Sequence, residues 1–366
     1  HTVTGYTATA DNELYDVESD FTFTPAEDAT LVDGVIAAKR TDAGTTNMGL
    51  DSTQFTNNNA NFNVTFNVED GYQIIERASL TVTADNKQKN YGMPDPTLTA
   101  TITGLKGSDT ESVINYTIRR DPGEALRDYT ITVTGEAVQG NYNVTYVPGI
   151  FKIFGMPQDL TITSASETIP YDGTLHTKPV YTVTFNGNLL TATNSEGTKF
   201  VMPITGDTLT ITPTFTGVTN VTDANNVDNN NTFTYVLENA AIYIGTRTLT
   251  YGTVKVTPIT AEVTIKGDTN TTAYDGDEHT VTGYDVEISN PLYTEAYFTF
   301  TQAEGATLVG GVIAATRTDV GTTYMGLDST QFANTNGNFA TVTFNVTDGY
   351  QTITANDDAL TLTCPS

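Results

Sequence analysis

The stretch GVIAAKRTDAGTTNMGLDSTQF at 34–55 returns as GVIAATRTDVGTTYMGLDSTQF at 311–332, close to the other end of the 366-residue chain. Two flanking stretches repeat in the same order: HTVTGY (1–6 and 279–284) and VTFNVEDGYQ, which becomes VTFNVTDGYQ (64–73 and 342–351). Near-identical blocks in one order identify the two ends as copies of a single module. The chain is therefore an array of repeated units.

Alternation of apolar and polar residues runs along almost the whole chain and predicts an all-β fold. TLTATITG at 97–104 and YTITVTG at 129–135 have the strand period of two, whereas apolar spacing of helical period is hard to find. The capping patterns SDTE at 108–111 and DSTQ at 51–54 and 328–331 predict single helical turns between strands. We predict a tandem array of small β-sandwich or β-grasp-like modules.

A chain of this length is too long for one ordinary core and divides into several modules. We predict a first module at 1–77, a second at 78–155, a divergent third at 156–257, a complete copy of the first at 258–355 and a surplus terminal strand at 356–366. The joints are only a few residues long, which favours a semi-rigid, elongated rod over a flexible string.

The two copies differ in how they begin. The last copy opens with ITAEVTIKGDTNTTAYDGDE at 259–278, which supplies one strand and a turn, and the first copy lacks that strand. After the last copy the chain adds ALTLT at 359–363, which aligns with ASLTVTADNK at 78–87, where the next module starts. Two interpretations stay open: the chain is cut from a longer protein, or 359–363 completes the first module of a neighbouring copy.

Composition limits the partners. The chain carries 16 Lys and Arg against 43 Asp and Glu, a formal charge of −27. Nucleic acid is an unsuitable partner, because phosphate contacts require a basic face. No stretch is long and apolar enough for membrane insertion. The single cysteine, Cys364, precludes a disulfide within the chain, and it could join two chains.

A short phrase recurs around two of the three histidines, as YDGTLHT at 171–177 and YDGDEHT at 274–280. The residues are Tyr171, Asp172, Gly173 and His176, and Tyr274, Asp275, Gly276 and His279. Asp-Gly suits a tight turn, since Gly accepts a positive φ and Asp bonds the local backbone. A metal or general-base site would need more converging ligands, and no second His or Cys lies nearby. We interpret the phrase as a structural turn whose His bonds the turn or covers a strand end.

The stretch DANNVDNNNT at 223–232 resembles a calcium loop in part. Asp223 and Asn225 alternate as oxygen ligands, but Val227 takes the next ligand position and no closing Glu follows. We predict a solvated hairpin loop. Calcium is the one cofactor that the sequence allows, with Asp268 and Asp275 as further candidate ligands.

A lysine buried beside an acid in a β-sandwich can be crosslinked to Asn or Asp. Lys39 becomes Thr316 in the matching copy, so that position offers no shared crosslink. Lys152 and Lys255 fall among the polar residues of their strands, and we expect them to face solvent.

Two sets of phrases resemble known repeats. Tyr171-Asp172-Gly173 and Tyr274-Asp275-Gly276, each followed by a His and an alternating strand, resemble the YDG-type repeat of bacterial cell-surface proteins. Tyr91-Gly92, Asp95-Pro96-Thr97-Leu98, Gly104-Leu105, Arg119, Gly123-Glu124, Tyr129 and Asn141-Tyr142 resemble the MBG-type repeat of large adhesins. The third module departs from the pattern, because it lacks the GLDSTQF and DGYQ phrases.

The resemblance implies an extracellular, multi-module adhesin or stalk at a bacterial cell surface, without catalytic residues. We predict a non-enzymatic segment that projects or connects binding functions. A filament subunit assembled by strand donation through 359–363 is an alternative, and a glycan- or host-protein-binding module is another, since the chain has 19 Tyr. The predicted partners are neighbouring modules, copies of the same chain, and a host glycan or protein.

Overall fold

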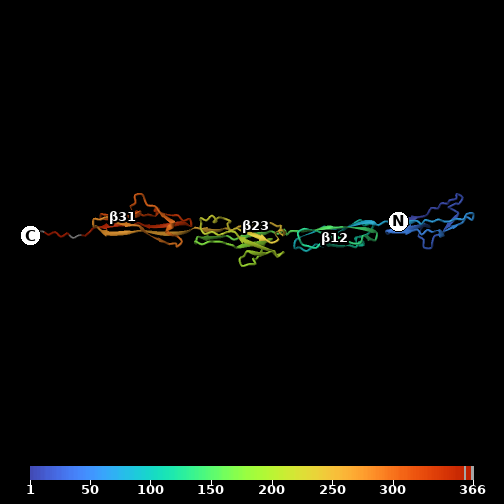
Figure 1. Cartoon of the computed structure of the whole chain (residues 1–366), viewed down its shortest axis with the longest axis horizontal. Helices are drawn as coiled ribbons and strands as arrows, with labels where there is room; N and C mark the ends of the chain where they lie inside the picture. Colours follow the sequence, from blue (N-terminus) through green and yellow to red (C-terminus); the bar gives the residue numbers. More distant parts are fainter. Residues whose placement is uncertain (358–359, 364–366) are drawn as a thin grey trace. The chain divides into compact units, whose positions relative to one another are not determined.

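A computed structural model describes residues 1–357 and 360–363 of the chain, and nearly all regular structure in it is short strand (Figure 1). The helical elements in this part are single 3-10 turns: η1 (Ser52–Gln54), η2 (Glu111–Val113), η3 (Ala240–Ile242), η4 (Glu295–Tyr297) and η5 (Ser329–Gln331). Within the same residues, no helix has the length and apolar character needed to cross a membrane. The all-β prediction with occasional helical turns is confirmed.

The chain divides into two compact units, 1–156 and 157–366. Each sheet among the described residues lies within one of the four predicted modules. We call 1–77, 78–155, 156–257 and 258–355 segments 1 to 4, and their boundaries stay a prediction.

Segment 2 is a sandwich of two four-stranded sheets, in the orders β10-β8-β14-β13 and β11-β12-β15-β9. The strands are β8 (Ala78–Ala84), β9 (Lys87–Asn90), β10 (Ala100–Thr103), β11 (Thr117–Arg120), β12 (Asp128–Thr134, labelled in Figure 1), β13 (Val138–Gln139), β14 (Tyr142–Val147) and β15 (Gly149–Phe154). We call β8 and β9 the first run of the segment, and β14 and β15 its last run. The two runs lie parallel, β8 with β14 and β9 with β15. Within each run the chain passes from one sheet to the other. Alternate residues such as Val82, Ile131 and Phe151 are fully buried in the core.

Segment 4 has the same parallel pairing of its first and last runs. β25 (Ile259–Gly267) lies parallel to β34 (Phe339–Thr347), and β26 (Thr269–Ala273) lies parallel to β35 (Tyr350–Thr354). On its other edge β25 pairs antiparallel with β28 (Tyr284–Ile288). The remaining strands are β27 (His279–Thr282), β29 (Phe298–Phe300), β30 (Leu308–Val309), β31 (Val312–Arg317, labelled in Figure 1), β32 (Gly321–Tyr324) and β33 (Phe332–Asn334). Val263 and Ile265 of β25 are fully buried, so this strand forms the middle of the core.

Segment 3 follows the plan despite its divergent sequence. β16 (Leu160–Ser164) lies parallel to β23 (Arg247–Thr250, labelled in Figure 1), and β17 (Glu167–Pro170) lies parallel to β24 (Val254–Thr257). The other strands are β18 (Tyr181–Phe185), β19 (Asn188–Leu189), β20 (Lys199–Val201), β21 (Thr208–Pro213) and β22 (Phe233–Leu237). A parallel pair of first and last runs is therefore common to segments 2, 3 and 4.

Segment 1 lacks one member of that pair. Its strands are β1 (Thr2–Thr4), β2 (Phe21–Phe23), β3 (Leu31–Val32), β4 (Val35–Lys39), β5 (Gly44–Asn47), β6 (Phe55–Asn57) and β7 (Tyr72–Ile75), and none of these is a counterpart of β25. Residues 6–10 and 62–69, the counterparts of β28 and β34, form no strand. No strand of the described residues pairs with either stretch.

Two local predictions differ from the structure. η2 begins after Thr110 rather than Ser108 and has no side-chain cap, so SDTE is not a capping box. Leu360–Thr363 were expected in a surplus strand, but these residues are in no strand. Cys364 lies outside the described residues. The two DSTQ phrases do form capping boxes, with Asp51 and Asp328 as the N-caps.

Candidate functional site

Each YDG phrase forms a turn. Gly173 and Gly276 take φ values of 80° and 91°, which glycine accepts without strain. The carboxylate of Asp172 accepts the Thr174 N–H at 2.8 Å, and that of Asp275 accepts the Asp277 N–H at 3.0 Å. In segment 4 the turn carries the chain from β26, paired with β35, to β27, paired with β31. The phrase thus joins two sheets.

A His–Asp pair closes each turn. Nε2 of His176 lies 2.9 Å from Oδ1 of Asp172, and Nε2 of His279 lies 3.0 Å from both oxygens of Asp275. Hydrogen bonds from the backbone and hydroxyl of Thr174, and then from His176, lower the pKa of Asp172 to about 2. The pKa of Asp275 is also lowered, first by the backbone N–H of Asp277. The two carboxylates therefore stay charged, and they accept hydrogen bonds from residues of their own turn.

The calcium candidates bond to the protein. Asp223 accepts the backbone N–H groups of Thr219 and Asn220 at 2.9 and 2.8 Å, and the amide of Asn225 donates to the carbonyl of Gly217. Across residues 1–357 and 360–363, no three His, Cys, Asp or Glu side chains are grouped so that they could hold a metal. Asp268 and Asp275 therefore belong to no such group, and a calcium role for any of these residues stays a prediction.

The asparagine-rich loop is less solvated than expected. Asn230 and Asn231 are 8% and 2% exposed. The Asn230 amide donates to the carbonyl of Val254 and accepts its N–H, both at 2.7 Å, and Asn231 donates to the carbonyl of Ala165 at 2.8 Å. These carboxamides satisfy backbone groups of distant parts of segment 3, so the expectation of a solvated loop is wrong for them. Composition does not distinguish such residues from exposed ones.

Lys152 and Lys255 are exposed, as their strand positions predict, and Lys39 is exposed as well. Lys89, by contrast, has a buried side chain that is 6% exposed. Its Nζ lies 2.7 Å from Asp95 and 2.6 Å from Glu124. Sequence reasoning missed it, because Lys89 stands in the polar run Lys87–Asn90 with no apolar neighbours.

Arg120 completes this ion network. Its guanidinium bonds to Asp95 and to Glu124, and it lies 4.8 Å over the ring of Phe151. The hydrogen bond from Arg120, followed by that from Lys89, lowers the pKa of Asp95 to about 2. Forming an amide crosslink would require a protonated acid and a neutral amine. The two cations keep Asp95 ionised, and, although burial opposes it, the carboxylates of Asp95 and Glu124 raise the pKa of Lys89 and keep it charged. The network therefore holds the loops that carry Asp95 and Glu124 against β9 and β11. Arg119, named in the family resemblance, is exposed.

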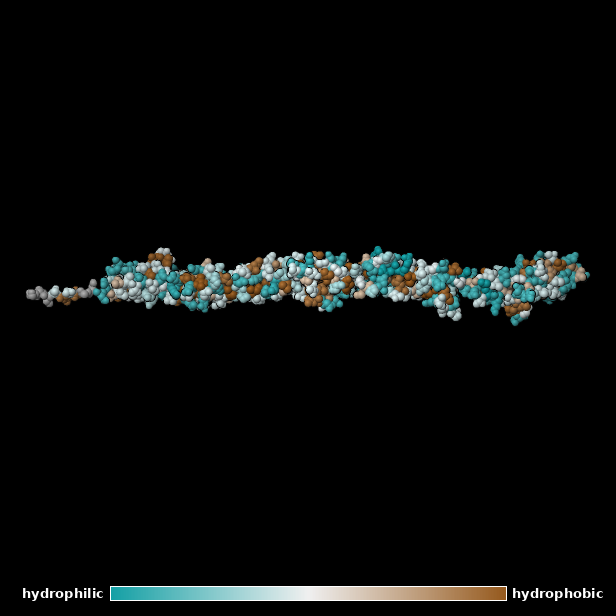
Figure 2. All heavy atoms as spheres, turned by 90° about the horizontal axis from the view of Figure 1, so that it is seen from below, coloured by the Kyte–Doolittle hydropathy of each residue, from teal (hydrophilic) through white to brown (hydrophobic). Residues whose placement is uncertain are grey.

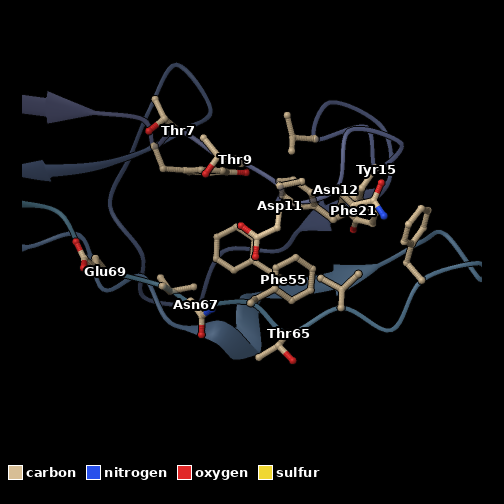
Figure 3. Close-up of a pocket in the computed structure, with 18 of the residues that line it drawn as sticks. Thr7, Thr9, Asp11, Asn12, Tyr15, Phe21, Phe55, Thr65, Asn67 and Glu69 are labelled. Carbon is tan, nitrogen blue, oxygen red and sulfur yellow. The ribbon is translucent and has the colours of Figure 1, made fainter.

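A groove of about 460 Å³ opens in segment 1, between residues 6–12 on one side and 62–69 on the other. Figure 3 shows Thr7 and Thr9 on one flank and Thr65 and Asn67 on the other, with Phe55 between them. These flanks are the counterparts of β28 and β34, so the groove is the place that β25 fills in segment 4.

Comparison with known proteins gives a family match for one part of the chain. Residues 80–152 match the family model of the MBG domain, YGX type. The match lies in segment 2 and includes the ion network. No curated protein matches the chain. The likeness of segments 1, 3 and 4 to YDG-type repeats stays a prediction.

Proposed function

We propose that the chain is a non-catalytic spacer in an extracellular adhesin or stalk at a bacterial cell surface. The match of residues 80–152 to the MBG domain supports a repeat domain of the surface-protein type. The observation that carries the proposal is that, within each compact unit, one segment is hydrogen-bonded to the next. A spacer that transmits force or holds a distance needs such joints.

The joint in unit 1–156 centres on Asn141 of segment 2. Its Oδ1 accepts the N–H of Ala43 at 2.8 Å, and its Nδ2 donates to Asp42 at 2.9 Å. Arg77, at the end of segment 1, donates to the carbonyl of Gly140 at 3.2 Å. The tip of the β13–β14 hairpin thus holds a loop of segment 1.

The joint in unit 157–366 centres on Asn338 of segment 4. Its Oδ1 accepts the N–H of Val221 at 2.8 Å, and its Nδ2 donates to Asn220 at 2.9 Å. The ring of Tyr171, from the YDG turn of segment 3, meets Phe339 edge-on with centroids 5.9 Å apart. Hydrogen bonds and an aromatic contact together oppose bending at this joint.

The surface suits a protein exposed to solvent. On the face in Figure 2, apolar atoms lie in small groups among hydrophilic ones. With a formal charge of −27, copies repel one another at long range, which favours solubility.

Small-angle X-ray scattering of the full chain tests the spacer. We expect an extended particle whose profile changes toward greater flexibility in Asn141→Ala and Asn338→Ala. Asn61→Ala is the control, because Asn61 is the exposed counterpart of Asn338. A compact, sharply bent particle, or a profile insensitive to both joint variants, would contradict the proposal.

A further inference from the structure

The two joints are made by the same part of the module. Gly140–Asn141 precedes β14 in segment 2, and Gly337–Asn338 precedes β34 in segment 4. We call these two pairs the tips. The next residue is aromatic in both segments, Tyr142 or Phe339, and each is 2% exposed. The buried ring anchors the tip asparagine at a fixed place on its own core.

Glycine is required at each tip for a different reason. Gly140 has a φ of 53°, in the left-handed region that glycine accepts without strain. At Gly337 the reason is space, because a Cβ there would lie 2.6 Å from Cγ2 of Thr222, beside the loop that Asn338 contacts. The tip of segment 4 is therefore shaped for close approach to segment 3.

The backbone of each tip asparagine binds the start of its own segment. The carbonyl of Asn141 accepts the N–H of Ala78 at 2.9 Å, and that of Asn338 accepts the N–H of Ile259 at 3.0 Å. Ala78 and Ile259 are the first residues of β8 and β25. The tip therefore lies where the chain enters the segment, which is the place where a bend between two modules would occur.

The side chain of each tip asparagine binds the preceding segment at two points. Oδ1 accepts a backbone N–H, from Ala43 in segment 1 and from Val221 in segment 3, at 2.8 Å in both. Nδ2 donates to the side-chain oxygen of the residue before it, Asp42 or Asn220, at 2.9 Å in both. We call 41–43 and 219–221 the receptor loops. Their sequences, TDA and TNV, share the pattern Thr-Asx-apolar, in which Asx is Asp or Asn.

Arg40 holds the receptor loop of segment 1 in shape. Its Nε donates to the carbonyl of Asp42, and its Nη2 donates to that of Ala43, both at 2.7 Å. A loop whose shape is fixed before contact loses less conformational entropy when it binds. This receptor loop is therefore prepared by residues of its own segment.

The asparagine-rich loop does the same for segment 3. Asp223 accepts the N–H groups of Thr219 and Asn220 at 2.9 and 2.8 Å, and Asn226 donates to the carbonyl of Val221 at 2.9 Å. The side-chain amide of Asn220 also donates to Asp223, at 3.2 Å, which leaves Oδ1 of Asn220 for the tip. The stretch that resembles a calcium loop thus positions a receptor loop.

We propose that the sequence Gly-Asn-aromatic before a last run is a module-coupling motif, and that its partner is a β-module presenting a Thr-Asx-apolar receptor loop. The tip carboxamide is the selective group, because it offers one acceptor and one donor side by side. The receptor loop offers the complementary N–H and oxygen. This inference rests on the proposed spacer, since it names the groups by which one module of the spacer binds the next.

The charge of one receptor loop makes this selectivity testable. Asn141 donates to the carboxylate of Asp42, so Asn141→Asp would place two carboxylates in contact without a hydrogen to share. Asp42→Asn in the same chain should restore the contact, because the new carboxamide can donate to the new carboxylate. Asp42→Asn alone keeps an acceptor oxygen and should leave the joint intact, as Asn220 does in segment 3.

Amide hydrogen exchange of Ala43 in the full chain, resolved by NMR, measures the contact. We expect Asn141→Asp to raise the exchange rate about tenfold, which corresponds to the loss of one hydrogen-bonded contact. The double variant Asn141→Asp/Asp42→Asn should return close to the wild-type rate. Asn143→Asp is the control, since it adds the same charge at an exposed position of β14. An unchanged rate in Asn141→Asp, or a double variant no slower than the single one, would overturn the coupling motif.

Exchange at Val221 tests Asp223 as a positioning residue. Asp223→Ala should raise this rate in the wild-type background but add little in Asn338→Ala, because both substitutions then act on one contact. Asp228→Ala, at an exposed position of the same stretch, is the control. Additive effects of the first two substitutions would overturn the positioning role. So would a faster rate after EDTA is added to the wild-type chain, since a calcium ion would then hold the loop.

The coupling motif and the spacer can fail separately. Small-angle scattering reports the extension of the particle, whereas exchange at Ala43 and Val221 reports the two contacts. A compact particle with the expected exchange responses would contradict the spacer alone. An extended particle whose exchange rates ignore the tip variants would contradict the coupling motif alone.

Discussion

Asn61 and Asn338 are the same residue of the repeated module in two surroundings. Asn338 is 6% exposed and bonds to Val221 and Asn220, whereas Asn61 is exposed. Because the module around them is nearly identical, the pair separates the effect of the joint from the effect of the side chain itself. The repeated module thus supplies Asn61 as a matched control for a substitution at Asn338.

We expect Asn338→Ala to lower the free energy of unfolding of unit 157–366 by about 1–2 kcal/mol, since the Val221 N–H loses its acceptor. Asn61→Ala should change stability by less than about 0.5 kcal/mol. Urea denaturation of the full chain measures both. Equal effects of the two substitutions would show that the joint contributes nothing.

The ion network gives a second residue-scale prediction. Asp95→Asn removes one of two carboxylates that hold the largely buried Lys89, and it weakens the contact with Arg120. After allowance for the 38% exposure of Asp95, we expect a loss of about 1–2 kcal/mol in thermal or urea unfolding. Asp128→Asn, whose carboxylate is 56% exposed and 3.8 Å from Lys152, should have little effect.

The same carboxylate predicts a pH dependence. The pKa of Asp95 is about 2 in the folded protein and about 3.9 in an unfolded chain. Its stabilising contribution is therefore present above about pH 4 and is lost as the pH falls toward 2. We expect Asp95→Asn to flatten the loss of stability across this window in melting curves. A variant with the wild-type slope would mean that Asp95 is not the titrating group.

At the scale of elements, the first and last runs of a segment depend on each other. β34 is a nine-residue strand because β25 lies beside it, and its counterpart at 62–69 forms no strand. Both stretches have almost the same sequence, VTFNVEDGYQ and VTFNVTDGYQ. Strand formation here is a property of the pairing rather than of local propensity.

Hydrogen exchange of the two stretches measures this dependence. Amides of 62–69 should exchange faster than those of 340–347, because only the latter have a ladder partner among the described residues. A variant with the sequence of 259–278 placed before His1 should show slower exchange at 62–69 and unchanged exchange at 340–347. Equal exchange in the unextended chain would contradict this account.

At the scale of the whole molecule, stability is distributed among separate cores. Each of the four segments has its own cluster of buried residues, and the chain forms two compact units. Tyr171 of segment 3 also packs against the core of segment 4, within the same unit. Unfolding should therefore proceed in more than one step.

Calorimetry of a core variant tests this independence. Ile265→Ala removes a fully buried side chain from β25 and should cost about 2–5 kcal/mol in the transition of unit 157–366. The transition of unit 1–156 should keep its midpoint. A single transition that shifts as a whole would show instead that the two units unfold together.

Sequence patterns by themselves determined the all-β class, the array and the two DSTQ capping boxes. These features follow from local rules: alternation of apolar residues, turn chemistry at Asp-Gly, and direct comparison of the copies. The exposure of Lys152 and Lys255 followed from the same alternation.

Only the tertiary structure decided which strands pair and which polar residues are buried. Alternation tells which face of a strand is apolar, but it does not name a partner about 80 residues away, such as β34 for β25. Lys89, Asp95 and Arg120 meet, and Asn230 reaches Val254, because the folded sheets bring distant loops together. The groove in segment 1 has the same origin, because the fold places residues 6–12 opposite residues 62–69.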